Sequence, residues 1–198
     1  AAAQGDQNAM EFRDSLVVKM TPAEITQAQK LAREFKPQDA YTKSFRESQT
    51  LAEKGDRDAQ FNLGVIYYSG QGVAIDYALA LQWFKKAAFQ GHSLAQYNVG
   101  YMYEKGEGTP QDYEESVKYY RQSAERGNRL AQYVLGSMYE KGQGVPRDEV
   151  QALMWYNLAA VQGETKARIA RDHVTVWMTR AQITEAQRLS REFKVIGK

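Results

Sequence analysis

A block of 36 residues recurs three times in this chain of 198 residues, with no insertion or deletion between copies. Its clearest landmarks in the first copy are Gly64, Tyr67, Gly70 and Asp76, and the same residue types return 36 and 72 positions later. A fixed period of this size is typical of a solenoid, because one unit cannot bury its own apolar face and stacks on its neighbour. The repeat therefore predicts an array of stacked units.

Each block has the pattern of two amphipathic helices. On the first helix, apolar residues recur with the spacing of one helical face, at Ala59, Leu63, Ile66 and Tyr67. On the second helix, the same spacing places Ala80, Trp83, Phe84, Ala87 and Ala88 on one face. The array is therefore predicted to be all-α, built from antiparallel helix pairs.

Turn residues separate the two helices of each block. Gly70 and Gly72 follow the first helix, where glycine can adopt the left-handed conformation of a C-cap. Asp76 precedes the second helix, where a carboxylate can accept hydrogen bonds from free N–H groups. Gly91 is expected to end the second helix.

One glycine in each block falls in the middle of the first helix, at Gly64, Gly100 and Gly136. A glycine there costs about 1 kcal/mol relative to alanine, so a recurring one needs a reason. We expect a neighbouring helix to cross closely at this point. The large rings expected to fill the adjacent space are Trp83, Tyr119 and Trp155.

A second similarity has an offset of 158 residues: Ile25–Lys36 matches Ile183–Lys194. Both copies are read as terminating helix pairs, so Ala1 would fall within or at the end of a helix that begins upstream, in a longer or processed protein. The predicted organisation is a terminal helix pair of a preceding array at 1–36, a linker helix or partial repeat at 37–55, repeats at 56–91, 92–127 and 128–163, and a C-terminal capping helix pair at 164–198.

Composition argues against several classes of partner. The net charge is only +2 and charged residues make up 25% of the chain, without the clustered lysine and arginine of a nucleic-acid binder. The tyrosines of the repeat keep phase with core positions, which favours packing over stacking on bases. No apolar run reaches the length of about 18 residues that a membrane span requires, so no membrane insertion is expected. Cysteine is absent.

No arrangement of residues indicates catalysis, a metal or a cofactor. The Gly-x-Gly loops follow a helix, whereas a phosphate-binding loop follows a strand. Each loop carries a single recurring aspartate, too few carboxylates for a calcium site. The only histidines, His92 and His173, lie far apart in sequence and have no phased partner. We expect a protein that is not an enzyme.

The consensus A-Q-x-x-L-G-x-x-Y-x-x-G-x-G-V-x-x-D-x-x-x-A-x-x-W-x-x-x-A-A-x-x-G resembles the Sel-one-like repeat (SLR) family, relatives of tetratricopeptide repeats. Ala59–Gly91 and Ala131–Gly163 fit it closely, and Ala95–Gly127 departs from it at several positions: Thr109, Ser116, Tyr119 and Ser123. The resemblance implies a right-handed superhelical solenoid that serves as a scaffold for protein assembly. It also implies a bacterial protein of the periplasm or the extracellular space.

In helix-pair solenoids the first helices line the concave side, which forms an extended binding groove. The positions between the core residues of the first helices should therefore face a partner. We call these nine residues the first-helix stripe: Asn62, Val65, Tyr68, Asn98, Tyr101, Glu104, Val134, Ser137 and Glu140. Tyr68 and Tyr101 are the expected anchors, and Asn62 and Asn98 could hydrogen-bond a peptide backbone.

The sequence favours a non-catalytic scaffold that binds a protein or peptide along the first-helix stripe. The alternative is a structural module whose solenoid ends stack into homo-oligomers or fibres, because an uncapped end of an array exposes apolar surface.

Overall fold

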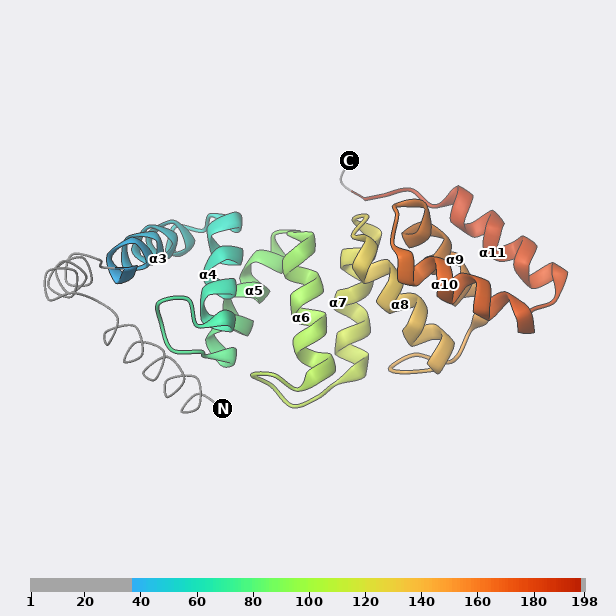
Figure 1. Cartoon of the computed structure of the whole chain (residues 1–198), viewed down its shortest axis with the longest axis horizontal. Helices are drawn as coiled ribbons and strands as arrows, with labels where there is room; N and C mark the ends of the chain where they lie inside the picture. Colours follow the sequence, from blue (N-terminus) through green and yellow to red (C-terminus); the bar gives the residue numbers. More distant parts are fainter. Residues whose placement is uncertain (1–36, 197–198) are drawn as a thin grey trace, which may run out of the picture. The chain divides into compact units, whose positions relative to one another are not determined.

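The computed structural model describes residues 37–196. The helix pair predicted at 1–36 lies outside the described residues. The chain divides into two units, 1–43 and 44–198, and the second holds the repeats. The helices of the described residues follow one another in Figure 1 as α3 (Pro37–Glu53), α4 (Arg57–Ser69), α5 (Tyr77–Phe89), α6 (Ser93–Lys105), α7 (Tyr113–Glu125), α8 (Arg129–Lys141), α9 (Glu149–Val161), α10 (Thr165–Val174) and α11 (Arg180–Glu192), with a short 3₁₀ turn η1 (Thr175–Trp177) after α10.

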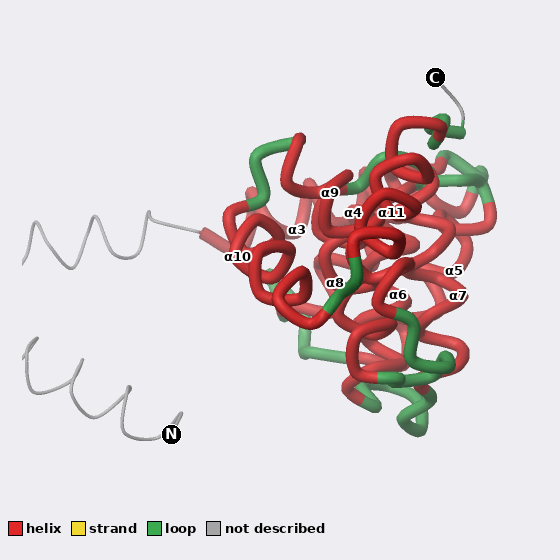
Figure 2. Tube along the Cα trace, turned by 90° about the vertical axis from the view of Figure 1, so that its right-hand side faces the viewer, coloured by secondary structure: helices red, strands yellow, loops and turns green. Residues whose placement is uncertain are grey.

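Throughout residues 37–196 every regular element is helical, as Figure 2 shows. Each repeat is one helix pair, α4 with α5, α6 with α7 and α8 with α9, and the second helix of each pair packs against the first helix of the next. The prediction of an all-α solenoid is therefore confirmed. The expected first and second helices correspond to the even-numbered and odd-numbered helices from α4 to α9.

The helix ends follow the predicted turn residues. Gly70 closes α4 in the left-handed conformation with φ of 71°, and its N–H donates to the Ile66 carbonyl. The carboxylate of Asp76 accepts a hydrogen bond from the Leu79 N–H at the start of α5, at 2.9 Å. The same caps recur in the next two repeats. The turn between the two helices is therefore capped in the same way in all three repeats.

The mid-helix glycines do mark close helix crossings. A Cβ atom on Gly100 would stand 2.9 Å from the Tyr120 ring and 3.2 Å from the Ser116 carbonyl oxygen. Gly64 and Gly136 are covered in the same way by Phe84 and Tyr156. The rings expected to cover these glycines were Trp83, Tyr119 and Trp155. Each covering ring is instead the next residue of the second helix, because that residue faces the first helix of the same repeat.

The C-terminal segment turns back over the second helices. Helix α11 packs against α9, and the Phe193 ring meets the edge of the buried Trp155 with centroids 5.3 Å apart. The chain then continues to Ile196, whose N–H donates to the Glu125 carbonyl at 2.9 Å. The C-terminal segment is therefore held to α9 by apolar contact and to the end of α7 by a backbone hydrogen bond.

Candidate partner-binding surface

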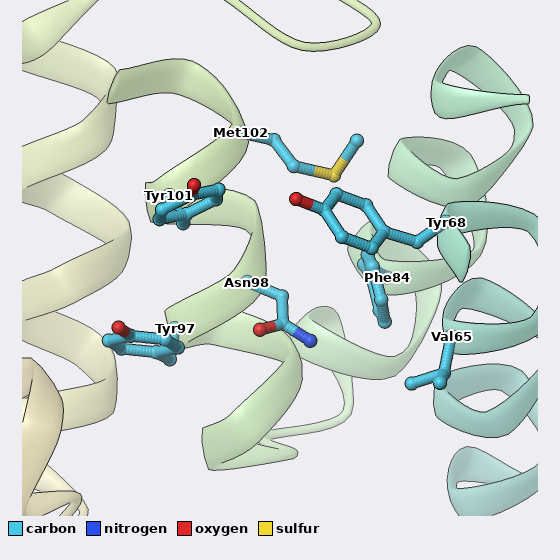
Figure 3. Close-up of a pocket in the computed structure, with 7 residues that line it drawn as sticks. All are labelled: Val65, Tyr68, Phe84, Tyr97, Asn98, Tyr101 and Met102. Carbon is cyan, nitrogen blue, oxygen red and sulfur yellow. The ribbon is translucent and has the colours of Figure 1, made fainter. Parts of the chain in front are cut away.

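A pocket of about 310 Å³ lies between the first helices of two consecutive repeats, α4 and α6. Four residues of the first-helix stripe line it: Val65 and Tyr68 from α4, and Asn98 and Tyr101 from α6. Its remaining lining residues are Phe84, Tyr97 and Met102. In Figure 3 the Tyr97 and Tyr101 rings form one wall, and Tyr68 faces them from the other helix with its hydroxyl toward Tyr101.

The pocket has its shape because one repeat differs from the other two at a pair of facing positions. On the first helices, the positions in phase are Tyr68, Glu104 and Glu140. On the second helices, the facing rings are Phe84, Tyr120 and Tyr156. The change is therefore coordinated: a glutamate faces each tyrosine, and a tyrosine faces the phenylalanine.

Hydrogen bonds explain this pairing. The Tyr120 hydroxyl donates to Glu104 at 2.9 Å, and Tyr156 donates to Glu140 at 2.6 Å. Phe84 has no hydroxyl, so a glutamate at position 68 would lack this donor. Tyr68 stands there instead and adds a ring to the pocket wall.

Tyr68 reaches into the next repeat. Its hydroxyl donates to the carboxylate of Glu107, which lies in the turn after α6, at 2.9 Å. Burial raises the pKa of the Tyr68 phenol, and the hydrogen bond to Glu107 and the negative charge of that carboxylate raise it further. The phenol stays protonated and the bond ties the two walls of the pocket together.

Three polar groups of the pocket have no hydrogen-bond partner within the described part of the chain. They are the side-chain amide of Asn98 and the hydroxyls of Tyr97 and Tyr101. Half-buried polar groups without protein partners are available to a ligand, because a ligand that pairs with them breaks no hydrogen bond within the protein. The pocket therefore combines apolar rings with free donors and acceptors.

The other stripe residues lie outside this pocket. Asn62 is exposed on α4, the one member of the stripe with that degree of exposure. Val134 and Ser137 are half-buried on α8, and Val134 packs against the core of the third repeat. Eight of the nine stripe residues are half-buried, so the expectation of an exposed stripe is corrected in this respect.

The two glutamates of the stripe are already engaged. Glu104 pairs with Lys105 at 2.7 Å in addition to Tyr120. Glu140 lies 3.6 Å from the exposed His173, besides accepting from Tyr156. Both carboxylates therefore support neighbouring rings.

Sequence reasoning missed Phe84, Tyr97 and Met102. Tyr97 stands one helical turn before Tyr101, and its counterparts Phe61 and Tyr133 are also aromatic. An aromatic residue at this position of every repeat was the signal that could have identified Tyr97. Met102 is fully buried and was hidden among core positions. Phe84 was assigned to the core of the second helix, and its role as pocket floor depends on the neighbouring repeat.

Within residues 37–196 no group of three or more histidine, aspartate or glutamate side chains could hold a metal ion. Among the same residues, no helix combines the length and the apolar character needed to cross a bilayer.

Comparison with known proteins gives the family. A sequence model described as the Sel1 repeat matches residues 57–92, 93–128 and 129–164. Among curated protein sequences, none matches the chain at a significant level.

Solved structures agree with this family. The chain is 38% identical to a Sel1 repeat protein from Oxalobacter formigenes, over 65% of this chain and 96% of that one, with a TM-score of 0.61. It is 27% identical to c5321, a protective antigen of uropathogenic Escherichia coli with an SLR fold, over 75% of this chain and 40% of that one, with a TM-score of 0.59. Cysteine-rich protein B of Helicobacter pylori shares the fold at 18% identity and a TM-score of 0.54, over 66% of this chain and 94% of that one.

Proteins built from Sel1 repeats are generally non-catalytic scaffolds that mediate protein–protein interactions. With three matched repeats, caps that recur in phase and stacked helix pairs, this chain belongs to the Sel1 repeat family.

Proposed function

We propose that this protein is a non-catalytic scaffold that binds a protein or peptide segment along its first-helix stripe. The observation that carries the proposal is the pocket between α4 and α6, which gathers Val65, Tyr68, Asn98 and Tyr101 in one place. A peptide side chain would fill the pocket, and the Asn98 amide would pair with the peptide backbone.

The residue types favour a concentration of the binding energy in the pocket rather than an even spread along the stripe. Tyrosine offers a large apolar area and a polar group while losing only two torsions, and such residues dominate interface energies. Tyr68 is already held in place by Glu107, so part of the ordering cost is met before a partner arrives.

Selection of displayed random peptides on the immobilised full chain tests this proposal. Selected peptides should bind the Tyr101→Ala variant about 5- to 100-fold more weakly, the range for loss of an interface anchor. Phe89→Ala is the matched control, since Phe89 is 94% exposed on α5 and lies outside the pocket. Selected peptides that bind Tyr101→Ala as well as the original chain would contradict the proposal, and so would a selection without any binder.

A second candidate function is self-assembly through the C-terminal end of the array. Three large apolar side chains stand exposed on α10 and η1: Ile169 at 66%, Val176 at 70% and Trp177 at 78%. In this reading a second copy of the chain covers them.

Light scattering over a range of protein concentrations separates the two candidates. Self-assembly predicts a mass that rises with concentration and returns to that of one chain in Trp177→Glu. A constant mass of one chain contradicts it and leaves the peptide-binding proposal untouched.

A further inference from the structure

The pocket between α4 and α6 has the chemistry to receive a positive charge. We propose that it accepts an arginine side chain of the partner segment, stacked on the tyrosine rings with its guanidinium directed at the carboxylates beside them. This inference rests on the proposed function, because it names the partner group that enters the same pocket.

The rings supply the stacking surface. Tyr97 and Tyr101 form one wall in Figure 3, and Tyr68 forms the other. The face of an aromatic ring is electronegative and attracts a cation placed within about 6 Å of its centre. A guanidinium is planar and weakly hydrated, so it stacks between such rings more readily than an ammonium does.

Carboxylates make the surroundings of the pocket negative. The pKa of the Tyr97 phenol is raised first by burial, then by the negative charge of Glu104, and by that of Glu164 at the start of α10. Glu104 belongs to α6 and Glu164 is the N-cap residue of α10, and the positive charge of Lys105 opposes them by less than either carboxylate contributes. A cation entering the pocket would meet this net negative field.

Glu107 is the carboxylate beside the pocket that can pair with an incoming cation. It accepts a hydrogen bond from the Tyr68 hydroxyl, and within the described residues no cationic side chain pairs with it. Glu104, in contrast, already has Lys105 at 2.7 Å. An incoming guanidinium would therefore pair with Glu107 beside the Tyr68 ring.

Lys105 shows that a cation can lie against this wall. Its Nζ stands 5.6 Å from the centre of the Tyr101 ring while it pairs with Glu104. Lys105 is exposed and approaches from outside, so it occupies the rim rather than the pocket. Removing its charge should make the pocket more favourable for a second cation.

The free polar groups fit the same ligand. A guanidinium carries five N–H donors in a fixed plane. The Asn98 side-chain carbonyl and the Tyr97 and Tyr101 hydroxyls can each accept one, in addition to Glu107. A ligand with a neutral apolar side chain would leave the Tyr97 and Tyr101 hydroxyls without partners.

The test uses the peptides selected on the full chain. We expect them to share an arginine, and replacement of that arginine by citrulline, which has the same shape without the charge, should weaken binding about tenfold. Glu107→Gln, which keeps an acceptor for the Tyr68 hydroxyl, should weaken binding about three- to tenfold, while Lys105→Met should strengthen it about two- to threefold.

Lys141→Met is the matched control, because Lys141 holds the position of Lys105 one repeat later, away from the pocket. Its binding should equal that of the original chain. Peptides that need Tyr101 but carry a neutral or acidic residue in place of arginine would overturn this inference and leave the proposed function intact. Equal affinity of the arginine and citrulline peptides would overturn it too. Peptides that ignore Tyr101 would overturn both.

Discussion

The hydroxyl of Tyr68 donates a hydrogen bond to the carboxylate of Glu107, 39 residues later, and so joins the first helix of one repeat to the turn of the next. Tyr68 lines the pocket, and the bond fixes the end of a ring that also packs against Tyr77 with centroids 5.2 Å apart. The other two repeats cannot form this bond, because they have glutamate in the place of Tyr68.

Tyr68→Phe should lower the free energy of unfolding by about 1–2 kcal/mol, since it removes a half-buried hydrogen bond to a charged group. Tyr101→Phe is the control, because the Tyr101 hydroxyl has no partner among the described residues, and its loss should cost little. Urea unfolding of both variants measures the difference. Equal stabilities would mean that the bond contributes nothing in solution.

Gly100→Val should destabilise the protein by about 2–4 kcal/mol, because the new side chain would collide with the Tyr120 ring in a closely packed crossing. Leu94→Val, on the exposed part of the same helix, measures the cost of a β-branched residue alone. Thermal unfolding checks both variants. A loss below about 1 kcal/mol for Gly100→Val would show that the crossing is loose.

Arg126→Gln should stabilise the protein by about 1 kcal/mol by completing a buried pair. In the first repeat Gln90 donates to Gln60 at 2.8 Å, and in the third Gln162 donates to Gln132 at 2.7 Å. The middle repeat has Arg126 instead, and the buried Oε1 of Gln96 has no partner.

Arg126→Ala separates the two effects of that substitution, since it removes the arginine without supplying a donor. Thermal unfolding should rank Arg126→Gln above the original chain and Arg126→Ala below Arg126→Gln. If glutamine and alanine at this position gave the same stability, the unpaired Gln96 oxygen would cost the protein no measurable stability.

His92 should make stability fall on acidification. Its ring stacks on Phe61 with centroids 4.3 Å apart, and its Nδ1 accepts the Ala95 N–H at the start of α6. Burial lowers the pKa of this histidine, and the Asp58 carboxylate only partly opposes that effect. The unfolded chain therefore takes up the proton first, and stability contributed by neutral His92 is lost as the pH falls below about 6.5.

His92→Asn should flatten this dependence, because Asn128 caps α8 from the same position of the next repeat without a titrating ring. Melting temperatures between pH 7.5 and 5 should fall less in the variant than in the original chain (~2 pH units are needed to cover the titration). Parallel curves for the two proteins would exclude His92 as a source of acid sensitivity.

Much of the fold follows from the sequence because its signals are local. The caps at Gly70 and Asp76 depend on residues within one turn of the chain, and the mid-helix glycines reflect a crossing inside one repeat. The role of His92 as a helix cap was missed, since histidine rarely fills that position and its ring is held by Phe61 from the preceding repeat.

The pocket could not be predicted from one repeat, because residues of two consecutive repeats form it. Val65, Tyr68, Asn98 and Tyr101 were predicted as partner-facing residues, yet nothing in their spacing said that they would share one pocket. That outcome depends on Phe84, whose missing hydroxyl explains why Tyr68 replaces glutamate. Comparing positions 68 and 84 across the repeats would have revealed the coupled change, but its effect on the surface required the structure.

The most direct test of the account is methionine methyl NMR during titration with a selected peptide. Met102 lines the pocket, and Met138 holds the same buried position one repeat later. Binding in the pocket predicts that the Met102 methyl signal shifts and saturates along the binding curve, while the Met138 signal moves much less. A saturating titration in which the Met102 signal stays still would place the partner elsewhere and contradict the account.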